Sequence, residues 1–367
     1  MKRRTFLSAA GIFSAMTLLN LKKLFAENSY LNEEEKIWEE LIDYARWSAS
    51  PHNVQPWRVK IISKYEAHLY YDPMRLLPIV DPASSYITLG LGMFIEGINI
   101  AANPLGYKVI AEHASDKQLD FTAIDLKFFA KLYLVETKEK VSIDRELIKK
   151  RKTSRLHYDG RVLDMVIVNS LSSIVSSHGF HFNYSSDKML ISDVVELNSK
   201  TILKGSDDDA ARNELAKWIR TSDEAAAEKK DGLWYRCMDV RAKLMQNFFC
   251  HHEKFQSKWK RKLIKRSLDK SVDGTGNIAW ISGPFATRAH WNNAGVLLLQ
   301  LWLEITKHNV FLHPFGAIIN EPFALADFKN RIQFDESTGT LWFLFRLGYS
   351  DEPPRSFRME VKDILIS

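Results

Sequence analysis

The chain has 367 residues, of which 46% are hydrophobic and 26% charged, a composition typical of a globular protein long enough for two packed domains. Its net charge of +6 comes from two short segments, because residues 1–26 hold five basic and no acidic side chains and residues 254–270 hold eight basic and one acidic. The rest of the chain is therefore net acidic, which excludes the domain-wide basic face of a nucleic-acid-binding protein.

The cysteines are Cys237 and Cys250, too few for a disulfide framework. The tripeptide Cys250-His251-His252 offers metal-ligand side chains. Neighbouring residues on a helix, however, point about 100° apart and cannot converge on one ion. The sequence predicts no metal site.

The first 26 residues have the layout of an export signal. A basic start is followed by an apolar stretch over residues 9–21, which is too short for a good membrane span. Residues 3–7, RRTFL, resemble the twin-arginine export motif, and Lys22 and Lys23 are typical of that pathway. The alternative is an amphipathic first helix with two surface arginines. We expect the export machinery to deliver the protein to the periplasm, and the sequence leaves open whether the signal is cleaved.

Hydrophobic periodicity predicts alternating helices and strands along the chain. In the first part these are a helix over 37–45 after a capping box at 32–35, strands over 57–62 and 67–71, a buried helix over 90–102 and a strand over 128–135. Further on they are helices over 144–152, 163–177, 187–203 and 293–307, and strands over 180–184 and 341–347. Residues 207–230 are polar and are expected to form solvated helix and loop.

Two of the predicted helices repeat one spacing. Gly92 and Gly295 each begin an apolar helix, and Gly106 and Asn309 follow 14 positions later. Glycine and asparagine are the residues that tolerate the left-handed conformation that ends many helices. Either the chain contains an internal duplication, or these are two unrelated core helices with ordinary ends.

Three polar clusters carry the candidate chemistry. Before the first strand, the stretch RWSASPHNVQPW gathers more hydrogen-bonding groups than a turn can use. A second cluster is the run RKTSR over residues 151–155. Its alternate residues Arg151, Thr153 and Arg155 would lie on one side of an extended segment or helix entry, where two cations and a hydroxyl suit a phosphate. The third lies near the end of the chain, after Leu347-Gly348-Tyr349. The candidate residues are Ser48, Ser50, His52, Asn53, Gln55, Arg151, Thr153, Arg155, Arg355 and Arg358. Taken singly, each basic group is more often part of a solvated surface patch than of a binding site.

Together the three clusters resemble the nitroreductase superfamily of flavin enzymes. RWSASPHNVQPW is similar to its small-residue–Asn-x-Gln-Pro-Trp signature, and Arg151-x-Thr153-x-Arg155 is similar to the Arg-x-Ser-x-Arg that holds the FMN phosphate. In that family the arginine motif comes first, whereas here the order is reversed and about 100 residues separate the two. A fusion of two copies explains the reversal, as in the Acg-type branch of single-chain pseudo-dimers that often carry twin-arginine signals.

The resemblance implies an α+β fold with two mixed sheets flanked by helices, arranged as two tandem degenerate copies that form a pseudo-dimer within one chain. The first half would span residues 30–140, and the second would span 141–367 with an insertion over about 205–275. The serines, His52, Asn53 and Gln55 would surround the flavin ring, and the arginines and Thr153 would hold the phosphate of FMN. No catalytic side chain is required, because the flavin takes electrons from NADH or NADPH and passes them to a small aromatic, nitro or quinone acceptor.

Two further interpretations remain open. The insertion could act as a lid, in which case the protein would bind and sequester flavin with little turnover. The basic helix over 254–270, on which Phe255, Trp259 and Leu263 recur every four residues, could lie on an anionic membrane surface. The more common arrangement packs such a stripe against the domain and turns the lysines to water. The acceptor, the nicotinamide preference and the oligomeric state are left open by the sequence.

Overall fold

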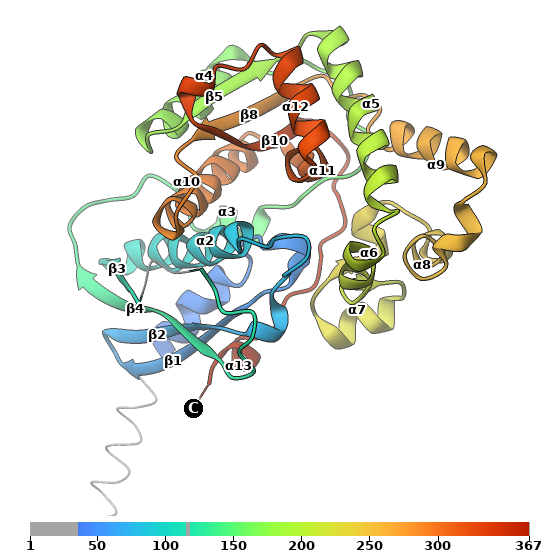
Figure 1. Cartoon of the computed structure of the whole chain (residues 1–367). Coiled ribbons are helices and arrows are strands. Elements are labelled where there is room, and N and C mark those ends of the chain that lie inside the picture. The colour runs from blue at the N-terminus through green and yellow to red at the C-terminus, as the bar shows by residue number, and fades with distance from the viewer. Residues whose placement is uncertain (1–35, 115–117, 367) are drawn as a thin grey trace, which may run out of the picture.

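The computed structural model describes residues 36–114 and 118–366 (Figure 1). The predicted export signal over residues 1–26 and the capping box at 32–35 lie outside this range. The described part begins within a helix that continues to residue 45, as the periodicity predicts.

The first half of the chain forms a four-stranded sheet of order β1-β2-β4-β3. Its elements are β1 (Trp57–Ser63), β2 (Glu66–Tyr71), α2 (Ser85–Ala102), β3 (Tyr107–His113) and β4 (Lys127–Glu136). The tight hairpin between β1 and β2 sets the register, and alternate strand residues such as Trp57, Val59, Leu69 and Tyr71 are buried.

The second half repeats this arrangement. Its sheet has the order β5-β8-β10-β9, which is the order of the first sheet when the strands are matched along the chain. The elements are α3 (Glu146–Lys150), α4 (Met165–Ser177), β5 (His181–Ser185), β8 (Ile278–Gly283), α10 (Arg288–Lys307), β9 (Phe311–Pro314), α11 (Gly316–Asn320), α12 (Pro322–Arg331) and β10 (Thr340–Gly348). The predicted α+β fold of two tandem copies is confirmed.

The prediction of mixed sheets is wrong, because all strand pairs within the two four-stranded sheets are antiparallel. Parallel pairing next to these sheets is limited to two isolated bridges, Val59 with Leu365 and Thr153 with Leu312. The first bridge joins the end of the chain, just after α13 (Val361–Ile364), to the edge of the first sheet. The final segment therefore crosses from the second half to the first, which gives the second half a contact with the opposite sheet.

Helices α2 and α10 lie between the two sheets and pack on each other (Figure 1). A Cβ atom at Gly92 would lie 2.4 Å from the carbonyl oxygen of Asn292, and one at Gly295 would lie 2.1 Å from the carbonyl oxygen of Leu89. Asn292 lies three positions before Gly295, and Leu89 lies three positions before Gly92. The two contacts are therefore equivalent under exchange of the helices, as in an isologous interface. The two helices that share the repeated spacing therefore pack on each other where the two halves of the chain meet.

The markers that follow the two helices have the same backbone conformation. Gly106 has φ of 86° and Asn309 has φ of 54°, both in the left-handed region. This conformation ends each helix and starts the strand that follows it, β3 in one half and β9 in the other.

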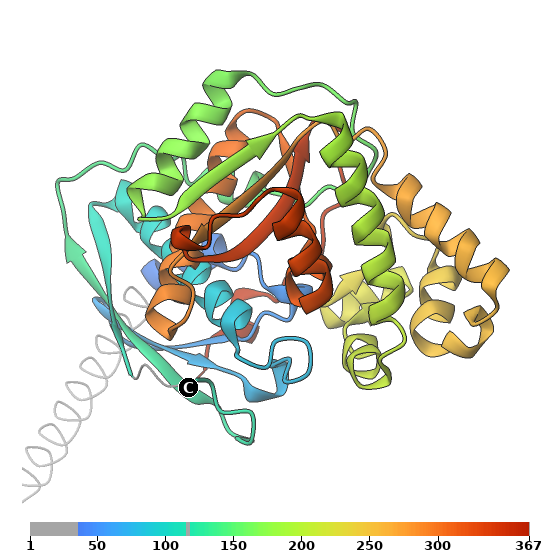
Figure 2. The same ribbon diagram turned by 45° about the horizontal axis from the view of Figure 1, so that its top comes forward.

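Between β5 and β8 the chain leaves the second sheet and forms the insertion, residues 186–277, at the side of both halves (Figures 1 and 2). Its elements are α5 (Lys188–Gly205), α6 (Asp209–Ala216), β6 (Ile219–Arg220), α7 (Asp223–Lys229), β7 (Leu233–Trp234), α8 (Ala242–Cys250) and α9 (Lys258–Ser271). The polar stretch over 207–230, expected to be solvated, instead includes the buried residues Glu214, Trp218 and Ala226. The domain boundaries drawn from the sequence stay a prediction.

Candidate functional site

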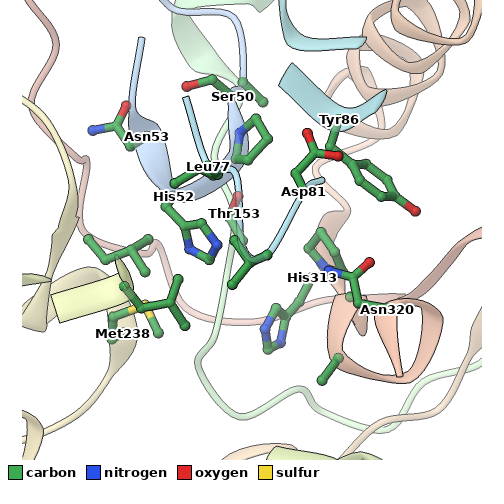
Figure 3. A pocket seen from close by; sticks show the side chains of 18 of the residues that line it. Ser50, His52, Asn53, Leu77, Asp81, Tyr86, Thr153, Met238, His313 and Asn320 are labelled. Atoms are coloured by element: carbon green, nitrogen blue, oxygen red, sulfur yellow. The ribbon is translucent and has the colours of Figure 1, made fainter. Parts of the chain in front are cut away.

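A cavity of about 700 Å³ opens between the two halves and the insertion (Figure 3). The first half contributes the loop after the first helix and part of α2, and the second half contributes α10, β9, α11 and β10. Residues 151–155, the final segment and the insertion complete the wall. Its volume lies within the roughly 300–1,000 Å³ of sites for small molecules.

The loop that reaches the cavity from the first half has an unusual backbone. His52, Asn53 and Gln55 have φ of 47°, 57° and 51°. Left-handed conformations cost about 1–2 kcal/mol at most non-glycine residues, so three of them within four positions must be held by the surrounding structure. Such strain tends to be found at ligand sites.

Two of the predicted ring-binding residues hold this loop and do not line the cavity. Ser48 is fully buried and donates to the carbonyl oxygen of Met93, 3.0 Å away. Gln55 is also fully buried; its amide donates to Lys230 O at 2.9 Å and accepts from Met359 N at 2.8 Å. Gln55 therefore joins the loop to the insertion and to the final segment, and the expectation that Ser48 and Gln55 face a ligand is corrected.

The other three loop residues line the cavity. The Ser50 hydroxyl accepts from Gln55 N at 3.0 Å, which ties the strained turn together. The Asn53 side chain donates to Gly232 O and Phe357 O, each 3.1 Å away, while its Oδ1 is buried without a hydrogen-bond partner in the described structure. Figure 3 shows the imidazole of His52 inside the cavity and Asn53 turned toward its edge.

The predicted phosphate residues Arg151, Thr153, Arg155, Arg355 and Arg358 all line the same cavity as this loop. The sequence-distant clusters are therefore brought together. Thr153 is placed by its bridge to β9, and Arg155 donates to Cys237 O of the insertion at 3.1 Å.

Two tryptophans that sequence reasoning did not select organise these arginines. The guanidinium of Arg151 stacks 4.4 Å from the centre of the Trp302 ring and donates to Trp47 O at 2.9 Å. The Trp47 ring in turn faces Arg355 at 3.4 Å and Arg358 at 5.8 Å. Trp47 lies inside the motif quoted from the sequence, so its position was a usable signal, whereas nothing in the predicted helix distinguished Trp302 from a core residue.

The arginine cluster carries positive charge that the protein does not neutralise. Within residues 36–114 and 118–366, Arg151, Arg155, Arg355 and Arg358 form no ion pair with a carboxylate. Burial, followed by the charges of Arg358 and Arg355, lowers the pKa of Arg151 to about 9, and burial lowers the pKa of Arg358 to about 10. The Nε atoms of both are buried without a partner in the same part of the chain. Unpaired buried cations are costly, so this wall is suited to an anion.

A histidine from the second half also lines the cavity and was not found from the sequence. His313 lies opposite Arg346 on the neighbouring strand, and the Nε of Arg346 donates to its Nδ1 at 3.2 Å. Because arginine only donates, the His313 proton must be on Nε2. Burial and the charges of Arg155 and Arg346 hold the pKa of His313 well below its usual value. It is therefore a neutral donor at physiological pH, and it lines the same cavity as His52 (Figure 3).

His52 is expected to make the ligand-free protein sensitive to acid. Burial, and then the charge of Arg155, lowers the pKa of His52 to about 4, whereas the unfolded chain takes up this proton near pH 6.5. The unfolded state therefore binds the proton first, and stability falls as the pH decreases from 6.5 to 4. At pH 5 a decrease in pKa from 6.5 to about 4 would lower the free energy of unfolding by about 2 kcal/mol. Because the side chain is partly accessible, we expect about 1 kcal/mol.

The variant His52→Asn tests this in denaturant titrations at pH 7 and pH 5, because asparagine tolerates the left-handed backbone. It should lose less stability on acidification than the natural protein. His157→Asn, which removes an exposed imidazole, is the matched control and should follow the natural profile. Equal acid sensitivity of His52→Asn and the natural protein would show that His52 is not the group responsible.

The insertion is fastened over the cavity by buried charges. The carboxylate of Glu214 accepts from the backbone of Ile79 and Val80 at 3.0 and 2.9 Å. Asp231 accepts from Arg75 at 2.9 Å and pairs with Arg220 inside the insertion. These contacts, together with Gln55 and Asn53, connect the insertion to the first half on the side where it lines the cavity.

No protein-family model and no curated protein matches the chain. Among solved structures it is similar to the FMN-dependent nitroreductase NfnB of Mycobacterium smegmatis in complex with NADPH, with 14% identity over 57% of this chain and 92% of that one and a TM-score of 0.33. It is also similar to a putative nitroreductase of Anabaena variabilis, with 11% identity over 79% of this chain and 69% of that one and a TM-score of 0.38. A third is an iodotyrosine deiodinase bound to FMN and 3-iodo-L-tyrosine, with 14% identity over 58% and 93% and a TM-score of 0.32. At these values the similarity does not assign a ligand or a reaction to this chain.

Proposed function

We propose that the protein is an FMN-binding oxidoreductase of the nitroreductase type, belonging to its single-chain pseudo-dimer branch. The observation that carries this proposal is a group of four arginines that line one cavity and form no ion pair with a carboxylate of the described residues, while the strained loop of the opposite half lines the same cavity. A phosphate supplies the negative charge that the cluster lacks, and guanidinium groups bind it through charge-assisted hydrogen bonds.

The residues present fit FMN on two further counts. The buried Nε atoms of Arg151 and Arg358 and the Oδ1 of Asn53 have no hydrogen-bond partner among the described residues, as expected for groups that complete their bonds to a ligand. The rest of the lining includes aromatic and apolar side chains, among them Trp342, Phe343 and Met93. Such a wall suits a flat ring system, which buries a large apolar area.

In this proposal Arg151, Arg155, Arg355 and Arg358 hold the phosphate with Thr153, and Ser50, His52 and Asn53 lie at the ring. When bound, FMN supplies two-electron chemistry between a reduced nicotinamide, NADH or NADPH, and a small aromatic, nitro or quinone acceptor. His313 contributes a neutral N–H for an acceptor oxygen, held in one tautomer by Arg346. The neutral state of His52 and His313 also keeps further positive charge away from the arginines.

The second candidate function is flavin storage with little turnover. It is favoured by the insertion, which lines the cavity and is fastened by Glu214 and Asp231. A closed insertion would limit access of a nicotinamide to the cavity, without affecting retention of the flavin.

Anaerobic addition of NADH or NADPH to the FMN-loaded protein separates the two functions. We expect the flavin absorbance to bleach, and we expect Glu214→Ala to bleach at least about tenfold faster. Its carboxylate makes two hydrogen bonds to backbone N–H groups, each contributing about 1.5–3 kcal/mol to closure. The control Glu228→Ala removes an exposed carboxylate of the same insertion and should behave as the natural protein.

If neither NADH nor NADPH bleaches the flavin absorbance of the natural protein or of Glu214→Ala, while dithionite bleaches both, the protein is a storage protein. Equal rates of bleaching in all three proteins would show that the insertion is no barrier.

We also propose that the protein acts in the periplasm after export through the twin-arginine pathway. The support is the motif RRTFL with its basic flanks. A cofactor loaded before export agrees with this route, because the cavity is assembled from both halves and requires the folded chain. Fractionation of expressing cells tests the location, and recovery only from the cytoplasm would contradict it.

A further inference from the structure

Helix α9, Lys258–Ser271, presents an exposed face that sequence reasoning expected to be packed. Trp259 and Leu263 are 62% and 51% exposed. They are one turn apart, so their side chains lie next to each other on the helix surface. Two of the three residues of the stripe that was predicted to pack against the domain therefore face solvent, because α9 packs on α5 through another face. The third, Phe255, is half-buried and contacts Phe248.

The basic residues of α9 divide between its two faces. On the packed side Arg261 binds the carboxylate of Asp207, with distances of 2.7 and 2.9 Å, and Lys265 binds Asp269 at 2.9 Å. The exposed residues of α9 follow the spacing of a single helix face and include no acidic side chain; they are Lys258, Trp259, Lys262, Leu263, Arg266, Ser267 and Lys270. None of the four cations in this group forms an ion pair within the described residues. We call this set the α9 face.

We propose that the α9 face docks the protein on a lipid bilayer that contains anionic headgroups. A row of four cations that form no ion pair within the described residues runs beside the exposed tryptophan and leucine, an arrangement typical of helices that lie in the membrane interface. Each cation near an anionic surface adds attraction, and tryptophan prefers the boundary between headgroups and acyl chains.

A bilayer fits this face better than a nucleic acid does. Phosphates occur in both, but the phosphate backbone of a nucleic acid offers no apolar surface to Trp259 and Leu263, and the remainder of the chain is net acidic. The same net acidity means that general electrostatic adhesion by the whole molecule does not account for binding, so attraction must come from α9.

The full chain is tested by co-flotation with vesicles of phosphatidylcholine containing phosphatidylglycerol and with vesicles of phosphatidylcholine alone. We expect binding to the anionic vesicles only, and we expect it to weaken as salt rises. Trp259→Ser combined with Leu263→Ser should lower the partition coefficient on the order of tenfold or more. Ile124→Ser combined with Met189→Ser, which removes two exposed apolar side chains elsewhere, should not change it.

A second pair of double variants tests the electrostatic contribution to vesicle binding. Lys262→Gln with Arg266→Gln should weaken binding to the anionic vesicles, whereas Lys138→Gln with Lys140→Gln, two exposed lysines of the first half, should not. All four variants change exposed side chains, so circular dichroism should report an unchanged fold.

Two results would overturn the proposal. One is equal vesicle binding by the α9 variants and their controls. The other is binding of a DNA duplex more tightly than of anionic vesicles, with no effect of the change at Trp259 and Leu263, which would identify the α9 face as a nucleic-acid surface.

Discussion

Arg151→Ala combined with Arg155→Ala is expected to abolish retention of FMN. Each guanidinium contributes charge-assisted hydrogen bonds of about 1.5–3 kcal/mol to a phosphate, so the loss of both should weaken binding by about 10²–10⁴-fold. Fluorescence titration of the ligand-free variant with FMN measures the change, and desalting after loading should remove the colour.

Removal of FMN binding by this variant should not come from unfolding. Arg151 is a buried cation near two other arginines, and burial with their charges lowers its pKa. Its positive charge therefore destabilises the ligand-free fold, and its removal relieves this. We expect the melting temperature of the ligand-free variant to stay close to that of the natural protein, while the rise in Tm on addition of FMN is lost. Lys329→Ala with Arg331→Ala, two basic residues of α12 that pair with surface carboxylates, is the charge-matched control and should bind FMN normally.

A variant that keeps its colour after desalting would show that these two residues do not hold the phosphate. A variant that is unfolded without ligand would instead show that the cluster is structural.

Gly295→Ala is expected to destabilise the whole molecule by about 2 kcal/mol or more and to lower Tm by about 3 °C or more, because the unfolding entropy scales with the 367 residues of the chain. The new methyl group would lie 2.1 Å from Leu89 O and 2.9 Å from Met93 N, which are backbone atoms of the facing helix and cannot rotate away. Alanine gains about 0.5–1 kcal/mol over glycine within a helix, so the steric cost must exceed this before any loss is seen.

Gly316→Ala is the matched control for this substitution. A Cβ atom there meets no other atom within 4 Å, so stability should change by less than about 0.5 kcal/mol. Thermal unfolding of both variants decides the matter. Gly295→Ala as stable as the natural protein would mean that α2 and α10 can separate at little cost, which the close reciprocal contact of the two helices argues against.

Much of the fold followed from local patterns. The helices α4, α5 and α10 and the strands β1, β2, β4 and β5 were predicted from the spacing of their apolar residues, whereas α2 and β10 were predicted from long apolar runs, because both are buried almost throughout. The strands β3, β8 and β9 were missed. Strand β8 is buried at every position and so shows no alternation, and β9 has only four residues.

Of the candidate site, too, the sequence predicted one part and missed another. The residue types of the loop over 48–55 and of Arg151 and Arg155 are chemically distinctive, so the sequence identified them although about 100 residues separate the two groups. Sequence could not tell which amide faces the ligand. Gln55 is fully buried because Lys230 and Met359, from distant parts of the chain, arrive to satisfy its side chain.

By itself the sequence determined the local elements, the repeated helix and the polar groups available for chemistry, because these depend on neighbours in the chain. Only the tertiary structure decided which of those groups line a common cavity, why His313 carries its proton on Nε2 and why Trp259 faces water. Each of these depends on a contact between residues far apart in sequence: Arg346 lies beside His313 only once β9 and β10 pair, and Trp259 is exposed only because the opposite face of α9 packs on α5.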